Sequence, residues 1–416
     1  MVLEKSLPMT AGDSECSYAN NSILQRRVIV KSKLLLEESV KNMLKNGIFP
    51  KCLRVADLGC SSGGNTLLCM SNVIDTVHNM CKENKYESPE FQVYLNGLPD
   101  NDFNTVFKSI PSFLEKYGNC YIAGVAGSFY QRLFPTNTLN FVHSSYSLHW
   151  LSQVPKGLEC NKKSILISES SPPLVVQAYS NQFNRDFSSF LRFRSQEVMS
   201  GGHMVLVYVG RSNPDPRSYD SCCLMDLLAN SLLHLAAQGK IKEDKIDSFN
   251  IPSYAPYQEE IKKIVQMEGS FSLEKLETFE TDMTAIDKPF EDIANLVVKT
   301  IRAVTEFSAF WLNSLLGGIS RASPSGSAIL RLVTFIAILH WFSTSQILKL
   351  WAIPCVTRTR LAIHRMFISV ADLVSFPWHT GTLSEMKSHS AVRQVVFAIS
   401  RISFSPLLQL VLLLFT

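Results

Sequence analysis

The segment "VADLGCSSGGNTL", residues 55–67, restricts the fold of this chain more than any other stretch. An apolar run ends at a loop of Gly, Cys and Ser, and apolar residues at helical spacing follow. A strand that turns through small residues into a helix brings free backbone N–H groups close to a ligand. The loop has no lysine of the GxxxxGK[ST] type and is not a full GxGxxG fingerprint. It suits a nucleoside ligand without a pyrophosphate, and a plain strand–turn–helix is the alternative.

Short apolar runs alternate with longer helical stretches between residues 53 and 280. The apolar runs predict strands over 53–59, 91–96, 120–127, 139–147, 203–210 and 271–280. Apolar residues at helical spacing predict helices over 65–83 and 175–198, and the "MSGG" of 199–202 is expected to stop the second helix before the next strand. This alternation predicts an α/β fold with a mainly parallel sheet, helices on both faces and a ligand at the carboxyl ends of the strands.

Two regions depart from the alternation. Residues 211–264 have the pattern of a mostly helical cap inserted after the fifth strand, which we expect to cover the edge of the sheet. After Glu306 the composition changes, because only Asp372 and Glu385 remain as acidic residues. We therefore expect one domain over 1–306 and a divergent hydrophobic tail over 307–416.

Composition excludes several classes of protein. A formal net charge of +4 over 416 residues, without basic runs that interleave with aromatic residues, argues against a nucleic-acid partner. The first fifteen residues are polar and contain no apolar core of a signal peptide. The ten cysteines form no CxxC pair, which is typical of reduced thiols in a cytoplasmic protein.

Six motifs then occur in a fixed order. They are "SYANNS" (17–22), "ADLGCSSG" (56–63), "NDFN" (101–104), "GSFYQRLFP" (127–135), "HSSYSLHWLSQVP" (143–155) and "DSFNIPSYAP" (247–256). Together they resemble the plant SABATH methyltransferases, which transfer a methyl group from S-adenosylmethionine to small carboxylic acids or xanthine alkaloids. The first and fifth motifs look most like the salicylate and benzoate carboxyl methyltransferases, with jasmonate-type members next. The resemblance implies a Rossmann-like class I methyltransferase sheet and pairing as a homodimer.

The resemblance also implies roles for individual residues. The residues matched to cofactor contacts, with Asp57 as a support of the loop, are Tyr18, Asp57, Cys60, Asn65, Leu98, Ser128 and Phe129. Gln25, His149 and Trp150 match contacts to the carboxylate and ring of the substrate. Amide and indole N–H groups are neutral donors, which hold a carboxylate without neutralising it. Because such an acid is already ionised at neutral pH, we expect catalysis by placement, with no catalytic acid or base.

The resemblance also implies a metal site. Asn161, Asp247, Phe249 and Asn250 match positions that hold Mg²⁺ in some members of the family, Phe249 through its backbone carbonyl. Oxygen ligands suit this hard cation. A turn that ends a helix is the alternative reading of the same residues.

One departure inside the matched region concerns the cofactor. The family motif "NDLP" is "NGLP" here, so Gly97 replaces the acid expected to hold the ribose hydroxyls. Asp100 and Asp102 lie nearby in the sequence but at a different offset. The loss of a charged hydrogen bond predicts about 10- to 100-fold weaker cofactor binding. The sequence leaves three hypotheses about function open. They are a carboxyl methyltransferase, a xanthine-type N-methyltransferase and, because of Gly97 and the altered tail, a catalytically impaired relative.

The resemblance ends where the tail begins. The family's last strand, which inserts antiparallel into the sheet, is missing from the tail or replaced, and 391–402 has some strand character. The apolar stretch 332–348 has about the minimum length of a membrane span, but it contains His340 and is flanked by Arg331 and Lys349. We favour an aberrant continuation of unrelated sequence over a membrane anchor.

Overall fold

The structure is a computed structural model, and it describes residues 9–15, 17–45, 49–239, 241–281, 299–300 and 303–304. The predictions for the tail over 307–416, including the apolar stretch 332–348 and the strand-like 391–402, lie outside the described residues. Within the described part, none of the helices has the length and apolar character that crossing a membrane requires.

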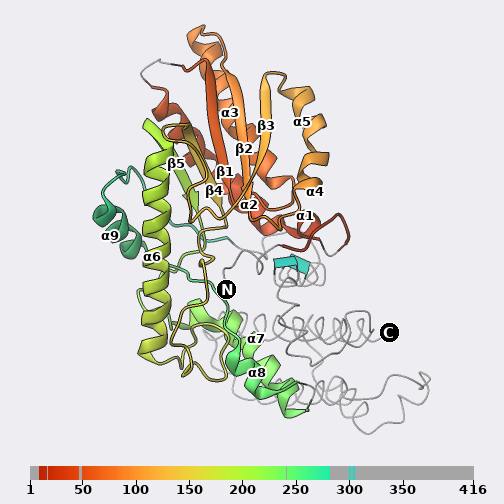
Figure 1. Cartoon of the computed structure of the whole chain (residues 1–416), viewed down its shortest axis with the longest axis vertical. Coiled ribbons are helices and arrows are strands. Elements are labelled where there is room, and N and C mark those ends of the chain that lie inside the picture. Colours follow the sequence, from red (N-terminus) through yellow and green to blue (C-terminus); the bar gives the residue numbers. More distant parts are fainter. Residues whose placement is uncertain are drawn as a thin grey trace, which may run out of the picture. The chain divides into compact units, whose positions relative to one another are not determined.

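Five parallel strands form the centre of the fold (Figure 1), in the order β3-β2-β1-β4-β5. They are β1 (Cys52–Leu58), β2 (Glu90–Gly97), β3 (Cys120–Ala126), β4 (Leu139–Ser145) and β5 (Val198–Val207). The order of the strands reverses between β1 and β4, and ligands bind at such a switch point, outside the carboxyl ends of the strands. The predicted α/β fold is confirmed.

Helices cover both faces of this sheet. Leu53 and Val55 of β1 belong to one apolar cluster with α2 (Ile23–Met43) and α3 (Asn65–Asn84). Ala56 and Leu58 of the same strand belong to a second cluster with α6 (Pro173–Glu197) and α9 (Gln258–Glu268). Successive side chains of a strand alternate between the faces, so a nearly continuous apolar run is what a strand buried on both sides requires. The short helices are α1 (Tyr18–Asn21), α4 (Phe103–Lys108) and α5 (Ile110–Lys116).

The inserted region is helical, as the sequence predicts. It contains α7 (Tyr219–Ala237) and α8 (Glu243–Ser248), drawn in green in Figure 1, which pack on each other. Leu232, Leu235 and Ile246 belong to a small apolar cluster that also includes Ile165, outside the inserted region. That the insertion acts as a lid stays a prediction.

Two sequence predictions about the sheet are wrong. Residues 271–280 form no strand: the described residues supply no partner beside β5, and Leu273 and Phe279 are 43% and 42% exposed. The "MSGG" of 199–202 does not separate helix from strand, because α6 ends at Glu197 and β5 begins at Val198. These four residues form an irregularity inside β5, where the register shifts and Gly201 has φ +76°. The expectation that the family's last antiparallel strand is missing or replaced concerns the tail, which lies outside the described residues.

Candidate active site

The loops after β1, β2 and β3 are tied together by one buried residue, Asn96. The carbonyl oxygen of Asn96, at the end of β2, accepts hydrogen bonds from the N–H groups of Gly59 (3.0 Å) and Cys60 (2.8 Å). The Asn96 amide donates to the carbonyl oxygens of Val125 and Gly127, each at 2.9 Å. Asn96 thus fixes the shape of the glycine loop identified in the sequence, although sequence reasoning did not assign it a role.

A cavity of about 410 Å³ lies at this end of the sheet. Five of the predicted site residues line it: Tyr18, Leu98, Ser128, Phe129 and Trp150. Four of them were predicted to contact the cofactor and Trp150 to contact the substrate. The structure therefore places residues of both predicted groups around one cavity.

The other predicted cofactor residues support the wall of the cavity. Asp57 accepts hydrogen bonds from Thr66 Oγ1 and, at 2.8 Å, from His143 Nδ1. Asn65, the first residue of α3, donates its amide to the carbonyl and hydroxyl oxygens of Ser22, each at 3.0 Å. Cys60 is buried in the glycine loop. Burial, and then the negative charge of Asp57, raises the pKa of the Cys60 thiol, so it remains a neutral packing group.

The partner of Asp57 is a buried histidine, His143. Burial lowers the pKa of His143, but the interaction with Cys69 and the hydrogen bond to Asp57 outweigh that effect and raise the pKa to about 10. The Asp57–His143 pair is buried at the end of β1 and β4. It anchors the start of the glycine loop, and it does not line the cavity.

The predicted substrate residues lie at the end of β4 and on α2. The rings of His149 and Trp150 are neighbours, with centroids 5.5 Å apart. Gln25 and His149 are buried and do not line the cavity. Among the described residues, Gln25 Oε1 and His149 Nδ1 have no hydrogen-bond partner. Burial lowers the pKa of His149 to about 4, so its imidazole is neutral at physiological pH.

Backbone contacts with the inserted region hold the His149–Trp150 segment. The N–H of Tyr254 donates to the His149 carbonyl oxygen at 2.8 Å, and the N–H of Leu151 donates to the Pro252 carbonyl oxygen at 2.7 Å. The Tyr130 hydroxyl donates to the Trp150 carbonyl oxygen at 2.7 Å. Three motifs that are far apart in the sequence therefore meet beside the cavity.

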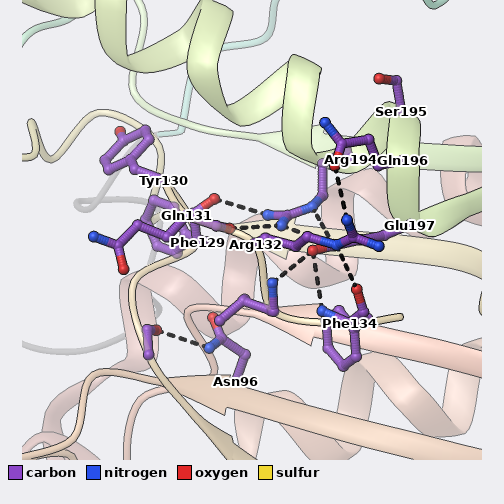
Figure 2. A network of polar contacts seen from close by, with 12 residues as sticks. Asn96, Phe129, Tyr130, Gln131, Arg132, Phe134, Arg194, Ser195, Gln196 and Glu197 are labelled. Carbon is purple, nitrogen blue, oxygen red and sulfur yellow. Dashed lines mark hydrogen bonds and ion pairs between the residues drawn. The ribbon is translucent and has the colours of Figure 1, made fainter. Parts of the chain in front are cut away.

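A buried ion pair fixes the loop after β3, which carries Ser128 and Phe129 (Figure 2). Arg194 and Glu197 are fully buried near the end of α6, and their side chains are 2.7 Å apart. Arg194 donates to the carbonyl oxygens of Phe129 (2.7 Å) and Gln131 (2.9 Å). Glu197 Oε1 accepts the N–H groups of residues 133 (2.6 Å) and 134 (3.0 Å). The sequence signal for this ion pair is two opposite charges three residues apart at the end of an apolar helix. The sequence-based prediction overlooked this signal.

Further polar residues around the cavity were also missed. Tyr130, Ser152 and Asp186 line it. Asp186 Oδ2 accepts the Ser152 N–H at 2.8 Å, and Oδ1 accepts the Ser152 hydroxyl at 2.6 Å. Burial raises the pKa of Asp186 despite these bonds.

The polar groups of the cavity fit a nucleoside cofactor. Ser61 and Ser145 line it, and their buried hydroxyl oxygens have no hydrogen-bond partner among the described residues. Ser61 and Tyr146, another lining residue, have φ near +55°, a strained conformation that residues other than glycine rarely adopt. Orphaned polar atoms and local strain are typical of a wall shaped for a ligand.

Three of the four predicted metal ligands bond to protein groups through their side-chain oxygens. The Asn161 amide donates to Asn250 Oδ1 at 2.9 Å, and Asn161 Oδ1 accepts the Ser171 hydroxyl at 2.8 Å. Asp247 accepts the Lys163 N–H at 2.8 Å and pairs with the Lys162 ammonium group at 3.3 Å. The Phe249 N–H donates to the carbonyl oxygen of residue 246. The side-chain oxygens of Asn161, Asp247 and Asn250 thus already bond to protein groups, and the part of the chain described holds no group of three or more His, Cys, Asp or Glu side chains that suits a metal.

Comparison with known proteins identifies the family. Residues 4–310 match the family described as "SAM dependent carboxyl methyltransferase". The chain belongs to this family. A benzoic acid/salicylic acid carboxyl methyltransferase 3 of Petunia hybrida is 44% identical over 314 residues, which cover 74% of this chain and 87% of the relative. A probable jasmonic acid carboxyl methyltransferase 2 of Theobroma cacao is 46% identical, with the same coverage.

Two further relatives bear on substrate and fold. Caffeine synthase 1 of Camellia crassicolumna is 43% identical over 72% of this chain and 84% of the relative. The solved structure of loganic acid methyltransferase with SAH is 33% identical, with a TM-score of 0.70, and the match covers 81% of this chain and 92% of that one. The chain is an S-adenosylmethionine-dependent carboxyl methyltransferase by family, and its fold is that of such an enzyme.

Proposed function

We propose that this methyltransferase esterifies the carboxylate of a small acid of the salicylate, benzoate or jasmonate kind. The observation that carries the proposal is the single cavity lined both by Tyr18, Ser128 and Phe129 and by Trp150. The relatives named for benzoic, salicylic and jasmonic acids support this class of substrate.

The cofactor half of the cavity is assigned to the carboxyl ends of β1, β2 and β3. We assign contacts with S-adenosylmethionine to Tyr18, Leu98, Ser128 and Phe129, and loop support to Asp57, Cys60 and Asn65. When bound, the cofactor supplies an electrophilic methyl group on its sulfonium.

The substrate half needs donors and no base. We assign Trp150, which lines the cavity, as a neutral donor to the carboxylate. From the resemblance we retain Gln25 as a second donor and His149 as a residue that shapes the pocket from behind its lining. A carboxylic acid has a pKa near 4 and is therefore ionised at neutral pH. His149 stays neutral because burial lowers its pKa to about 4. Placement of the ionised oxygen supplies about 7–11 kcal/mol of the reduction in barrier.

Xanthine-type N-methylation is the second candidate, because caffeine synthase 1 is 43% identical to the chain. A nitrogen nucleophile that carries a proton has to lose it, whereas a carboxylate has none to lose. A neutral His149 with a pKa near 4 is a poor acceptor for such a proton. The carboxylate substrate therefore fits these residues better.

The test is a methyl-transfer assay on the full-length chain. Purified protein is incubated with methyl-labelled S-adenosylmethionine and, separately, with salicylate, benzoate, jasmonate and a xanthine. We expect a labelled methyl ester from at least one acid. Labelled xanthine with no ester would establish the second candidate, and no product despite cofactor binding would establish the impaired relative.

Two further predictions concern pairing and location: the resemblance implies a homodimer, and the scattered cysteines indicate the cytoplasm. We retain the homodimer and the cytoplasmic location as predictions, which light scattering of the purified chain and cell fractionation would check. We do not propose Mg²⁺, because Asn161, Asp247 and Asn250 already bond to protein groups.

A further inference from the structure

The carboxyl end of β2 lacks the acid that this fold commonly uses. In open α/β sheets, an acidic residue after the second strand accepts hydrogen bonds from the ribose hydroxyls of a bound nucleotide. Gly97 is the last residue of β2 and lines the cavity. A Cβ atom at this position would lie 2.9 Å from both Cγ and Nδ2 of Asn101. The Asn101 side chain therefore already occupies the space into which a residue-97 side chain would grow.

The two neighbouring acids do not replace the missing one. Asp102 caps α4, where its Oδ1 accepts the Thr105 N–H at 3.1 Å. Its Oδ2 accepts the Gly12 N–H at 2.7 Å and the Thr105 hydroxyl at 2.6 Å. Asp100 is exposed in the turn and does not line the cavity.

The Asn101 side chain is fixed by its amide nitrogen, and its carbonyl oxygen Oδ1 accepts no hydrogen bond from the described residues. Its Nδ2 donates to the Ser61 carbonyl oxygen at 3.0 Å and lies 3.9 Å from Cys60 Sγ, which fixes the orientation of the amide against the glycine loop. Asn101 lines the cavity beside Gly97 and Leu98. No group among the described residues donates a hydrogen bond to Asn101 Oδ1. This oxygen is not among the fully buried side-chain atoms that lack a hydrogen-bond partner.

We propose that Asn101 Oδ1 accepts a hydrogen bond from a ribose hydroxyl of the cofactor, in the place of the acid that residue 97 does not supply. This inference rests on the cofactor half of the proposed function. A neutral acceptor forms a weaker hydrogen bond than a carboxylate does, and its loss corresponds to about a 5- to 10-fold change in affinity.

Isothermal titration calorimetry with S-adenosylhomocysteine and its 2′,3′-dideoxy analogue tests the proposal without turnover. We expect the wild-type chain to bind S-adenosylhomocysteine about 5- to 10-fold more tightly than the dideoxy analogue. Asn101→Ala should weaken S-adenosylhomocysteine by that factor and leave the analogue unchanged, so that the discrimination disappears. Asn104→Ala, at an exposed position of α4, is the matched control and should behave as wild type.

Gly97→Asp adds a second arm to the test. The new side chain would meet the flexible end of Asn101 and displace it, so an aspartate oxygen would take over the ribose. Asn101→Ala should then change the affinity less than 2-fold in the Gly97→Asp background. Equal losses from Asn101→Ala in both backgrounds would overturn the proposal.

The remaining outcomes are also decisive. If Asn101→Ala folds, as its melting temperature would show, and still prefers S-adenosylhomocysteine over the dideoxy analogue, Asn101 does not read the ribose. If the wild-type chain binds both ligands equally, this wall of the cavity makes no hydrogen bond to the ribose hydroxyls. The proposal then fails, while the proposed function stands. If a folded wild-type chain binds neither ligand, the proposed function itself fails.

Discussion

Replacement of Arg194 by methionine should destabilise the fold and loosen the loop after β3. The substitution keeps much of the volume but leaves Glu197 as a buried charge without its partner, and both side chains are 0% exposed. Removal of one member of a buried ion pair costs about 3–5 kcal/mol. The carbonyl oxygens of Phe129 and Gln131 also lose their donors. Because whole domains are stable by only about 5–15 kcal/mol, the loss should be large.

Urea unfolding, followed by circular dichroism, measures this effect on the full-length chain. Arg192→Met is the matched control, since Arg192 is exposed two residues earlier on α6 and its replacement should change the free energy of unfolding by under about 0.5 kcal/mol. In Arg194→Met chains that remain folded, S-adenosylhomocysteine should bind more weakly. A cost below about 1 kcal/mol with unchanged binding would refute the assignment of Arg194 as the residue that holds this loop.

Three further predictions concern other parts of the site. The pKa of His149 is about 4 in the folded chain and 6.5 in the unfolded chain, so the unfolded state binds a proton at higher pH than the folded state does. The free energy of unfolding should therefore have its full value above pH 6.5 and fall by about 3 kcal/mol between pH 6.5 and 4. Urea titrations across that range check this, and an equal fall in His149→Phe would contradict it. Gly59→Ala places a Cβ 2.2 Å from Ser147 Oγ at φ +82°, which should cost at least about 2 kcal/mol and abolish cofactor binding; a wild-type melting curve would disprove the clash. Trp150→Phe keeps a ring but removes the indole donor, so the KM for the acid should rise about 10-fold or more, and an unchanged KM would exclude that donor.

The parts of the fold that the sequence predicted are those that depend on the pattern of neighbouring residues along the chain. The five strands are short apolar runs, because a parallel sheet covered on both faces buries both sides of each strand. The run over 271–280 looks similar, but a strand also needs a partner, and that requirement is not local. The glycines of 199–202 were interpreted as a helix stop, whereas they allow β5 to shift register beside β4.

The residues of the candidate site also divide into those that local sequence motifs identify and those that only the three-dimensional fold brings together. Tyr18, Ser128, Phe129 and Trp150 lie in the contiguous motifs that carry the family resemblance, and all four line the cavity. Asn101 acts on a loop 40 residues away, and Arg194 holds a loop that lies 65 residues earlier in the chain. Such partners are brought together only by the order of the strands, and a single sequence does not show them.

The metal prediction illustrates a different limit. Asn161, Asp247 and Asn250 are chemically suitable oxygen ligands, and the motif places them in the same region of the fold. In the structure, the two amides bond to each other, and a lysine neutralises the carboxylate. Residue type predicts what a side chain can bind, but the protein's own donors decide whether its oxygens are available.

The pH dependence of methyl transfer to benzoate tests the central claim most directly, because that claim assigns catalysis to placement of an anion that is already ionised. With saturating cofactor, kcat/KM should stay level between about pH 6 and 8.5, since benzoate is ionised and His149 is neutral over that range. A rise in kcat/KM with an apparent pKa near 6.5 that disappears in His149→Gln would show a general base at work, and would contradict the claim.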